Sequence, residues 1–214
     1  MRRRLLARGA VCGVLAATLL VTAGCLEWLF PSPPDPGNGT GPQPAGVLFF
    51  DDFEDGLDPA WYTTPGWSVS DGWLYSSNRT WRRAYVLEGV DWMDYAVDVD
   101  LASKSGTVGV IVRCSEDLQD YVMLRATYET IRWRVYEDGE IVEETESLSP
   151  GLFDGVNHLR VEVQGNSYRV YVEDLLRSEF SWTGLTQGMP GVAAYAFWYN
   201  APPGFDNFRV TALE

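Results

Sequence analysis

Two acidic residues in one predicted strand are the first whose spacing could support chemistry. Asp98 and Asp100 are separated by one residue, so an extended chain places both carboxylates on the same face. Retaining glycoside hydrolases use two carboxylates about 5 Å apart, one as acid–base and the other as nucleophile. The alternative is a pair of solvated residues on the outer face of a half-buried strand. Because no third acid follows at this spacing, we interpret the pair as solvated.

The nucleophiles and bases are few. His158 is the only histidine of the chain, and no Ser/His/Asp arrangement or multi-histidine metal site forms around it at a meaningful spacing. Cys114 lies inside an apolar segment, where a small buried core residue is expected rather than a nucleophile. These residues favour a binding protein over an enzyme.

Arginine and aromatic residues share faces of several predicted strands. Aromatic rings offer flat apolar surfaces to ligands such as sugar rings, and charged groups can bond the hydroxyls. An alternative is that the arginines form ion pairs with the numerous acids of a solvated sheet. Alternation groups Arg113 with Ile111, Arg125 with Tyr121 and Met123, Arg132 with Arg134 and Tyr136, and Tyr195 with Phe197 and Tyr199.

Strands must position these residues, because the period-2 pattern dominates the chain after residue 46. No segment has a helical period longer than two turns, and turn residues recur about every 8 to 12 positions, as in sandwiches and jelly rolls. Asp71-Gly72 and Asp138-Gly139 are hairpin signals. The expected strands are 47–50, 67–69, 73–75, 95–101, 107–114, 121–127, 131–136, 141–142, 158–163, 168–172, 192–199 and 208–212.

Several motifs resemble bacterial concanavalin A-like, laminin-G-like jelly-roll domains, a superfamily that includes 3-keto-disaccharide hydrolase-like domains, laminarinases, lectin-like sugar binders and adhesion modules. The resemblance covers nearly all of residues 47–213 and implies an all-β, two-sheet antiparallel jelly-roll sandwich. The motifs are FDDFEDG at 50–56, WSVSDGWL at 67–74, GVIVR at 109–113, DYVMLR at 120–125, NHLRVEV at 157–163, YRVYVED at 168–174 and GFDNFRV at 204–210.

The resemblance also implies one concave sheet that can bind a ligand. We expect this sheet to present a shallow glycan-binding surface, which makes the domain a non-catalytic carbohydrate-binding module. The alternatives are a structural or adhesive protein-binding module and a glycoside hydrolase, although the Glu-x-Asp-x-x-Glu strand of family-sixteen hydrolases is absent. The candidate carbohydrate-binding residues are Trp81, Arg113, Arg125, Arg132, Arg134 and Tyr199.

A structural calcium ion often joins the first strand region to the last strand in this superfamily. The matching acids are Asp52 and Glu54 near the start of the domain and Asp206 near its end. Calcium prefers such hard oxygen ligands. The alternative is that these side chains cap their own turns.

The N-terminus is typical of an export signal. Arg2, Arg3, Arg4 and Arg8 precede an uncharged segment that ends in Thr22-Ala23-Gly24-Cys25, which resembles the bacterial lipobox. It implies cleavage after residue 24, a lipid on Cys25, a Pro/Gly-rich linker over 25–46 and a domain over 47–214. An ordinary signal peptide and an uncleaved anchor helix are the alternatives. We expect an extracytoplasmic, lipid-anchored protein; Leu26 favours the outer membrane where one exists.

The charge balance limits the partners. The chain has 16 basic and 30 acidic residues, and removal of residues 1–24 takes four arginines, which leaves a net charge of −18. Nucleic acid is therefore not expected as a partner, because phosphate binding needs basic surfaces. Docking to anionic lipid through charge is not expected either, so the lipid must supply the membrane attachment.

Overall fold

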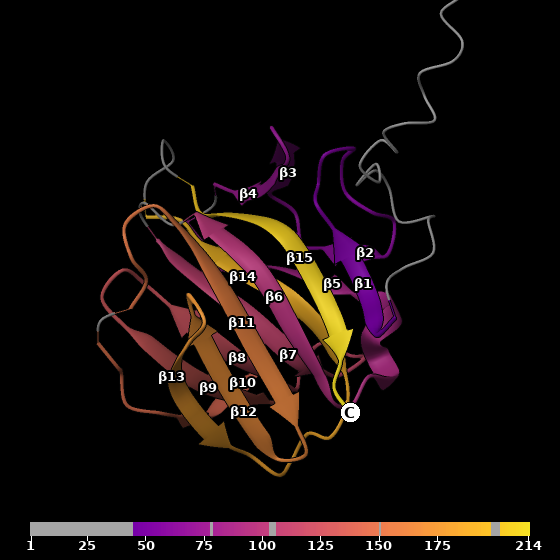
Figure 1. The fold of residues 1–214 in the computed structure, drawn as a ribbon, viewed down its shortest axis with the longest axis vertical. Coiled ribbons are helices and arrows are strands. Elements are labelled where there is room, and N and C mark those ends of the chain that lie inside the picture. Colours follow the sequence, from indigo (N-terminus) through magenta and orange to yellow (C-terminus); the bar gives the residue numbers. More distant parts are fainter. Residues whose placement is uncertain (1–44, 78, 103–105, 150, 198–201) are drawn as a thin grey trace, which may run out of the picture. The chain divides into compact units, whose positions relative to one another are not determined.

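The computed structural model describes residues 45–77, 79–102, 106–149, 151–197 and 202–214 (Figure 1). Cys25 and the export signal lie outside this range, as does Tyr199. No helix in the described part of the chain is long and apolar enough to cross a membrane.

The described chain forms two antiparallel sheets (Figure 1). Sheet A has the order β13 (Leu175–Ser181), β12 (Ser167–Val172), β11 (Val156–Gln164), β6 (Tyr95–Ala102), β15 (Gly204–Ala212), β4 (Trp73–Ser76) and β3 (Trp67–Ser70), and β1 (Val47–Asp51) also pairs with β15. Sheet B has the order β10 (Glu140–Glu144), β9 (Ile131–Glu137), β8 (Tyr121–Ala126), β7 (Thr107–Cys114), β14 (Met189–Tyr195), β5 (Arg82–Val86) and β2 (Trp61–Thr63). A short 3₁₀ helix, η1 (Leu87–Asp91), follows β5.

Strand alternation builds the core between the sheets. In β6 the buried residues Val97, Val99 and Leu101 point inward, and Val110 of β7 meets them from sheet B. Trp133 is fully buried in this core and donates its indole N–H to Ser178 Oγ at 3.1 Å. Burial of these apolar side chains removes them from water, which is the main favourable term for the fold.

The hairpin predicted at Asp71-Gly72 is confirmed. Both residues have positive φ, 52° and 73°, as a two-residue turn with the twist of the flanking strands requires. The turn joins β3 to β4 in the register Ser70 opposite Trp73. Local turn chemistry therefore fixes this edge of sheet A.

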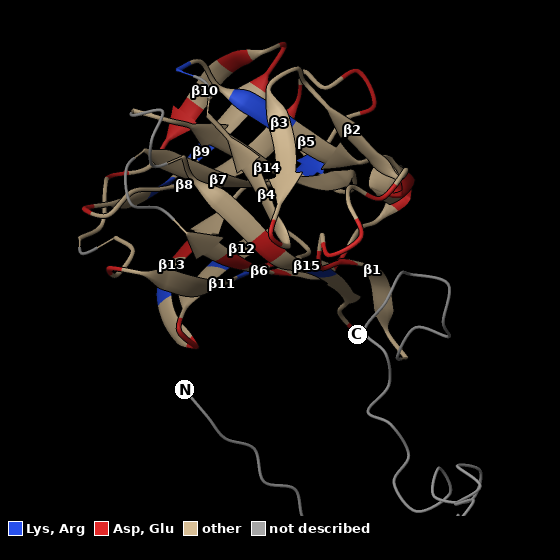
Figure 2. Cartoon of the chain, turned by 90° about the horizontal axis from the view of Figure 1, so that it is seen from above, with Lys and Arg blue, Asp and Glu red and all other residues tan. Residues whose placement is uncertain are grey.

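The outer faces of the two sheets differ. Sheet A has charged residues on its outer face, whereas sheet B buries a second apolar and aromatic cluster on the side away from the core. Its buried members are Tyr85, Ile111, Cys114, Tyr121, Met123, Tyr136, Met189 and Ala193. Acidic residues are most frequent in the loops and at strand ends (Figure 2). The outer face of sheet B is thus unlike an ordinary solvated sheet face.

Candidate functional site

Strands β8 and β9 present the predicted arginine and aromatic residues on the outer face of sheet B. Val122 and Leu124 face the core, so Tyr121, Met123 and Arg125 face outward. The register places Arg132 opposite Arg125 and Arg134 opposite Met123. The structure therefore brings Arg125, Arg132 and Arg134 together, as alternation predicted.

Strand β5 adds two residues that the sequence analysis did not single out. Ala84 and Val86 lie in the core, which turns Arg83 and Tyr85 to the outer face. Their signal was present in the sequence, because Arg83 and Tyr85 alternate with small and apolar residues. What the pattern did not reveal is that β5 joins β14 rather than β4, its neighbour in sequence.

A single row of residues crosses five strands of this face. The registers place Arg83 beside Ala193, Ala193 beside Gly109, Gly109 beside Arg125, and Arg125 beside Arg132. Ala193 and Gly109 in this row are small, so longer neighbouring side chains cover them.

Side chains from the two neighbouring strands pack over Gly109. A Cβ on Gly109 would lie 3.0 Å from Met123 Sδ and 3.2 Å from the Cβ of Ala193. Glycine at this position therefore lets the side chains of the flanking strands pack over the middle of the row.

Aromatic rings support two arginines of the row, Arg83 and Arg125. The rings of Tyr121 and Tyr136 stack with centroids 4.3 Å apart and planes 17° apart. The guanidinium carbon of Arg83 lies 5.4 Å from the Tyr121 ring centroid, and that of Arg125 lies 5.9 Å from the Trp81 ring centroid. Trp81 also contacts Tyr195, at 6.0 Å between centroids. Such cation–π contacts hold the flat side of each guanidinium against an aromatic ring.

We call this surface the arginine–tyrosine face. It comprises Trp81, Arg83, Tyr85, Tyr121, Arg125, Arg132, Arg134 and Tyr136.

Glu144 of β10 neutralises one end of the arginine–tyrosine face. It forms ion pairs with both Arg132 and Arg134. Burial acts to raise the pKa of Glu144, but the hydrogen bonds and charges of Arg134 and Arg132 outweigh it and lower the pKa. Glu144 therefore stays ionised.

Arg83 and Arg125 are less fully paired. The Nε atoms of both side chains are buried without a hydrogen-bond partner. Burial lowers the pKa of Arg125, and the positive charges of Arg134 and Arg132 lower it further. The middle of the face therefore carries excess positive charge.

Arg113 does not join this face, although simple alternation along β7 predicts that it does. β7 has one residue more than β14 between the pairs Cys114–Met189 and Ile111–Gly191, and Arg113 has a φ of 52°. This β-bulge reverses the alternation, so Cys114 faces outward and Arg113 turns inward. Arg113 is 1% exposed.

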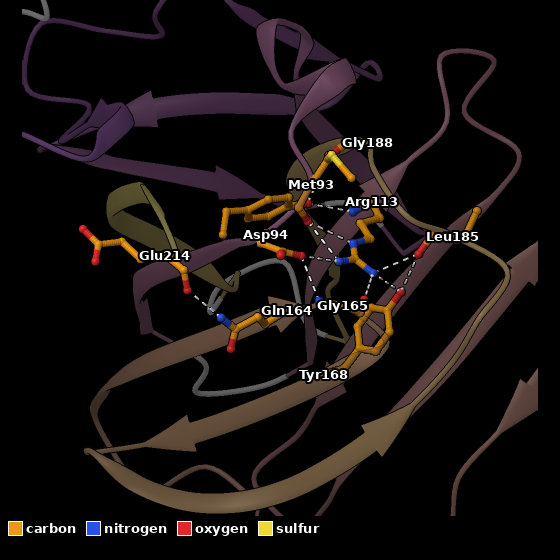
Figure 3. Close-up of polar contacts among 10 residues, drawn as sticks. Met93, Asp94, Arg113, Gln164, Gly165, Tyr168, Leu185, Gly188 and Glu214 are labelled. Atoms are coloured by element: carbon orange, nitrogen blue, oxygen red, sulfur yellow. Dashed lines mark hydrogen bonds and ion pairs between the residues drawn. The ribbon is translucent and has the colours of Figure 1, made fainter.

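The inward guanidinium is held by protein groups from three segments (Figure 3). It donates to the carbonyl oxygens of Met93 at 3.0 and 3.1 Å, Gly165 at 2.6 Å and Leu185 at 2.9 Å. It also donates to Tyr168 Oη at 3.2 Å and to Asp94 Oδ1 at 3.1 Å. With these partners Arg113 is a structural residue and leaves no donor for a ligand.

Cys114 behaves as a buried core residue. It is a free thiol within the outer apolar cluster of sheet B. Burial raises the pKa of the thiol to about 12, so it stays protonated and is a poor nucleophile near neutral pH.

The two acids of β6 lie on the outer face of sheet A, where basic side chains contact both. Arg160 Nη1 contacts Asp98 Oδ2 at 2.6 Å, and His158 Nδ1 lies 2.9 Å from Asp100 Oδ1. Asn207 also donates to Asp100, at 2.9 Å. The pair therefore forms part of a charge network rather than two free carboxylates facing a substrate.

The three candidate calcium ligands lie near one another. Burial raises the pKa of Asp206, and the nearby charges of Asp100, Glu54 and Asp52 raise it further. Asp206 accepts a hydrogen bond from the Asn207 amide at 2.6 Å, and Asp52 accepts one from the Glu54 amide at 3.3 Å. In the described ranges no group of three or more His, Cys, Asp or Glu side chains is arranged to hold a metal ion. The oxygen donors fit calcium in their chemistry, but the carboxylates of Asp52 and Asp206 are engaged in turn contacts.

No protein-family model matches the chain, and no curated protein matches it in sequence. Solved structures do match. The carbohydrate-binding module CBM66 from Bacillus subtilis is 17% identical with a TM-score of 0.60, and the match covers 72% of this chain and 96% of that module.

Two further structures have the same architecture. The Emp47p carbohydrate recognition domain is 14% identical with a TM-score of 0.61, over 80% of this chain and 99% of that domain. The Bacillus licheniformis β-glucanase is 13% identical with a TM-score of 0.55, over 80% of this chain and all (100%) of the enzyme. At these identities the likeness establishes the fold: the described residues form an all-β, two-sheet antiparallel jelly-roll sandwich of the concanavalin A-like class.

Proposed function

We propose that this chain is a cell-envelope lipoprotein whose jelly roll binds carbohydrate without hydrolysing it. The observation that carries the proposal is the arginine–tyrosine face. Trp81 and the four arginines are partly exposed, and the buried rings of Tyr121 and Tyr136 support them, so one ligand can contact the Trp81 ring and guanidinium donors together. The carbohydrate-binding names of CBM66 and the Emp47p domain support this ligand class.

The outer face of sheet A supports the non-catalytic part of the proposal. Asp98 and Asp100 are bound by Arg160 and His158, so neither carboxylate is free to protonate a leaving group or attack a sugar. Glycan release by the purified protein, measured as new reducing ends, would contradict this part.

Membrane attachment through Cys25 is the third part of the proposal. The motif Thr22-Ala23-Gly24-Cys25 and the Pro/Gly-rich linker that follows it support it. Cells expressing the protein should incorporate labelled palmitate into it, and Cys25→Ala should abolish the label. Retention of the label on the variant would overturn the anchor at this residue.

A glycan array and polysaccharide pull-down with the purified full-length protein test the binding site. Trp81→Ala and Arg134→Ala should each weaken binding at least tenfold, because they remove a ring and a charged donor from the face. Arg169→Ala is the matched control, since Arg169 lies on β12 of sheet A and pairs with Glu179. Binding unchanged by the first two substitutions, or absent throughout, would defeat the proposal, and a protein that copurifies instead would indicate an adhesive module.

A further inference from the structure

The arginine–tyrosine face has a charge opposite to that of the protein around it. Four arginines lie on it, and Glu144 is the acid found in ion pairs with them among the residues that the structure describes. Cleavage after residue 24 would leave a net charge of −18. In a protein with this net negative charge, a cluster of arginines on one sheet does not add to solubility. The cluster therefore indicates a local binding role.

Arg83 and Arg125 are placed to bind a negatively charged hydrogen-bond acceptor of a ligand. Each guanidinium packs its flat side on an aromatic ring, Tyr121 or Trp81 respectively. Each also has a buried Nε that lacks a hydrogen-bond partner. Both side chains are nevertheless partly exposed, and the group that matches the planar fork of a guanidinium is a planar carboxylate.

The side chains of Arg83 and Arg125 reach toward each other's strands. The two residues occupy the same row, with Ala193 and Gly109 between them. The guanidinium of Arg83 on β5 lies over Tyr121 of β8, and that of Arg125 on β8 lies over Trp81, next to β5. Both positive groups therefore lie over the middle strands of the face, where a polymer that carries carboxylates can meet them together.

The surroundings of Arg125 also favour a negatively charged ligand. Burial and the positive charges of Arg134 and Arg132 lower its pKa, because all three oppose its charge. A carboxylate placed beside Arg125 would reverse this effect.

We propose that the ligand of this face is an acidic polysaccharide, whose uronate carboxylates are recognised by Arg83 and Arg125. This inference rests on the proposed carbohydrate-binding function and narrows it to one chemical class. It differs from a general attraction between charges, because the protein as a whole repels a polyanion and the contact must therefore be local.

Matched polymers test the carboxylate directly. Polygalacturonate, alginate and hyaluronan are each compared with their own methyl esters, which keep the sugar chain and remove the charge. Isothermal titration with the purified full-length protein should show binding to at least one acidic polymer and at least a tenfold loss on esterification. Dextran sulfate and dextran form a second pair, in which dextran sulfate should bind at least tenfold more weakly than the best uronate.

Three variants test the arginines. Arg83→Gln and Arg125→Gln should each reduce uronate affinity at least tenfold. Arg125→Lys should also reduce it, because lysine keeps the charge but loses the planar fork. Arg169→Gln on sheet A removes the same charge elsewhere and should leave the affinity unchanged. Thermal melting of each variant checks that it is folded. If a Gln variant does not fold, Arg125→Lys takes its place as the test of the arginines.

The outcomes separate the two proposals. If a neutral glycan or a methyl ester binds as well as the acidic polymer, the carboxylate inference fails and carbohydrate binding stands. If dextran sulfate binds as tightly as the uronates, or if the Arg83 and Arg125 variants bind like the parent protein, the inference also fails. If no polymer and no array glycan binds, both proposals fail together.

Discussion

At the scale of single residues, Arg113 lies on a strand that lines the arginine–tyrosine face, but its side chain turns into the interior. Its guanidinium ties the segment before β6, the β11–β12 turn and the loop before β14 to the bulge in β7. Buried carbonyl groups without partners cost about 1–3 kcal/mol each. The residue therefore contributes to folding and not to recognition.

Replacement of this side chain tests its structural role. Arg113→Ala should lower the free energy of unfolding by at least about 3 kcal/mol, because the carbonyls of Met93, Gly165 and Leu185 lose a donor. Urea denaturation followed by tryptophan fluorescence measures the change. Arg169→Ala should stay within about 0.5 kcal/mol of the parent protein, as surface substitutions usually do. A shift of that small size for Arg113→Ala would refute the structural role.

His158 gives the charge network of sheet A a pH dependence. Burial acts to lower its pKa, but the hydrogen bond and charge of Asp100 and the charge of Asp98 outweigh it, so the pKa lies above the usual 6.5. A group whose folded-state pKa is raised contributes stability below its unfolded pKa and loses it as the pH rises through the folded value. The effect is modest, because the side chain is 40% exposed.

Unfolding in urea between pH 5.5 and 8.5 measures this contribution. The free energy of unfolding should fall across the upper part of this range, and His158→Gln should remove that part of the fall. NMR titration of the only histidine should give a pKa above 6.5 in the folded protein. A histidine pKa at or below 6.5, with identical profiles for both proteins, would contradict the assignment.

At the scale of elements, the bulge in β7 determines which side chains reach the arginine–tyrosine face. Gly188, just before β14, has a φ of +142°, and a Cβ there would lie 2.5 Å from the Cys114 carbonyl oxygen. Its own carbonyl accepts a hydrogen bond from Tyr95 Oη at 3.1 Å. The bulge thus depends on a glycine outside the strand that it reshapes.

Gly188→Ala tests this dependence. The substitution should destabilise the domain by about 1–3 kcal/mol through backbone strain, with added cost from the clash at Cys114. Gly165→Ala is the control, because Gly165 has a φ of +55° and nothing within 4 Å of the position of a Cβ. Thermal unfolding should show a larger loss for Gly188→Ala. Equal losses would mean that the close approach to Cys114 does not matter.

The sequence identified most elements of sheet B but only part of the face. The alternation of β8 and β9 correctly grouped Arg125 with Tyr121 and Arg132 with Arg134. It gave no sign that β5 lies next to β14. Alternation reports which residues share a side of one strand, whereas strand order depends on how the loops close.

At the scale of the whole domain, the calcium ion predicted from the sequence would join the start of the fold to its end. Asp52 and Glu54 follow β1, and Asp206 lies in β15, which pairs with β1. A cation there would relieve the repulsion that helps to raise the pKa of Asp206. These carboxylates would supply oxygen ligands, and the proposed effect is on stability.

Thermal melting tests the calcium proposal. The melting temperature should rise by several degrees in millimolar calcium, because a ligand that binds the folded state stabilises it. It should fall with chelator, and Asp206→Asn should remove most of the difference. An unchanged melting temperature in calcium, chelator and magnesium would rule the site out.

The sequence by itself determined the fold class, most of the strands and the faces of β8 and β9, because these follow from local alternation and turn residues. Only the tertiary structure placed Arg83 in the same row as Arg125 and turned Arg113 into the interior. The physical reason is that strand neighbours and bulges are set by contacts between distant segments. One extra residue in β7 reverses a face, and no pattern within β7 reveals it.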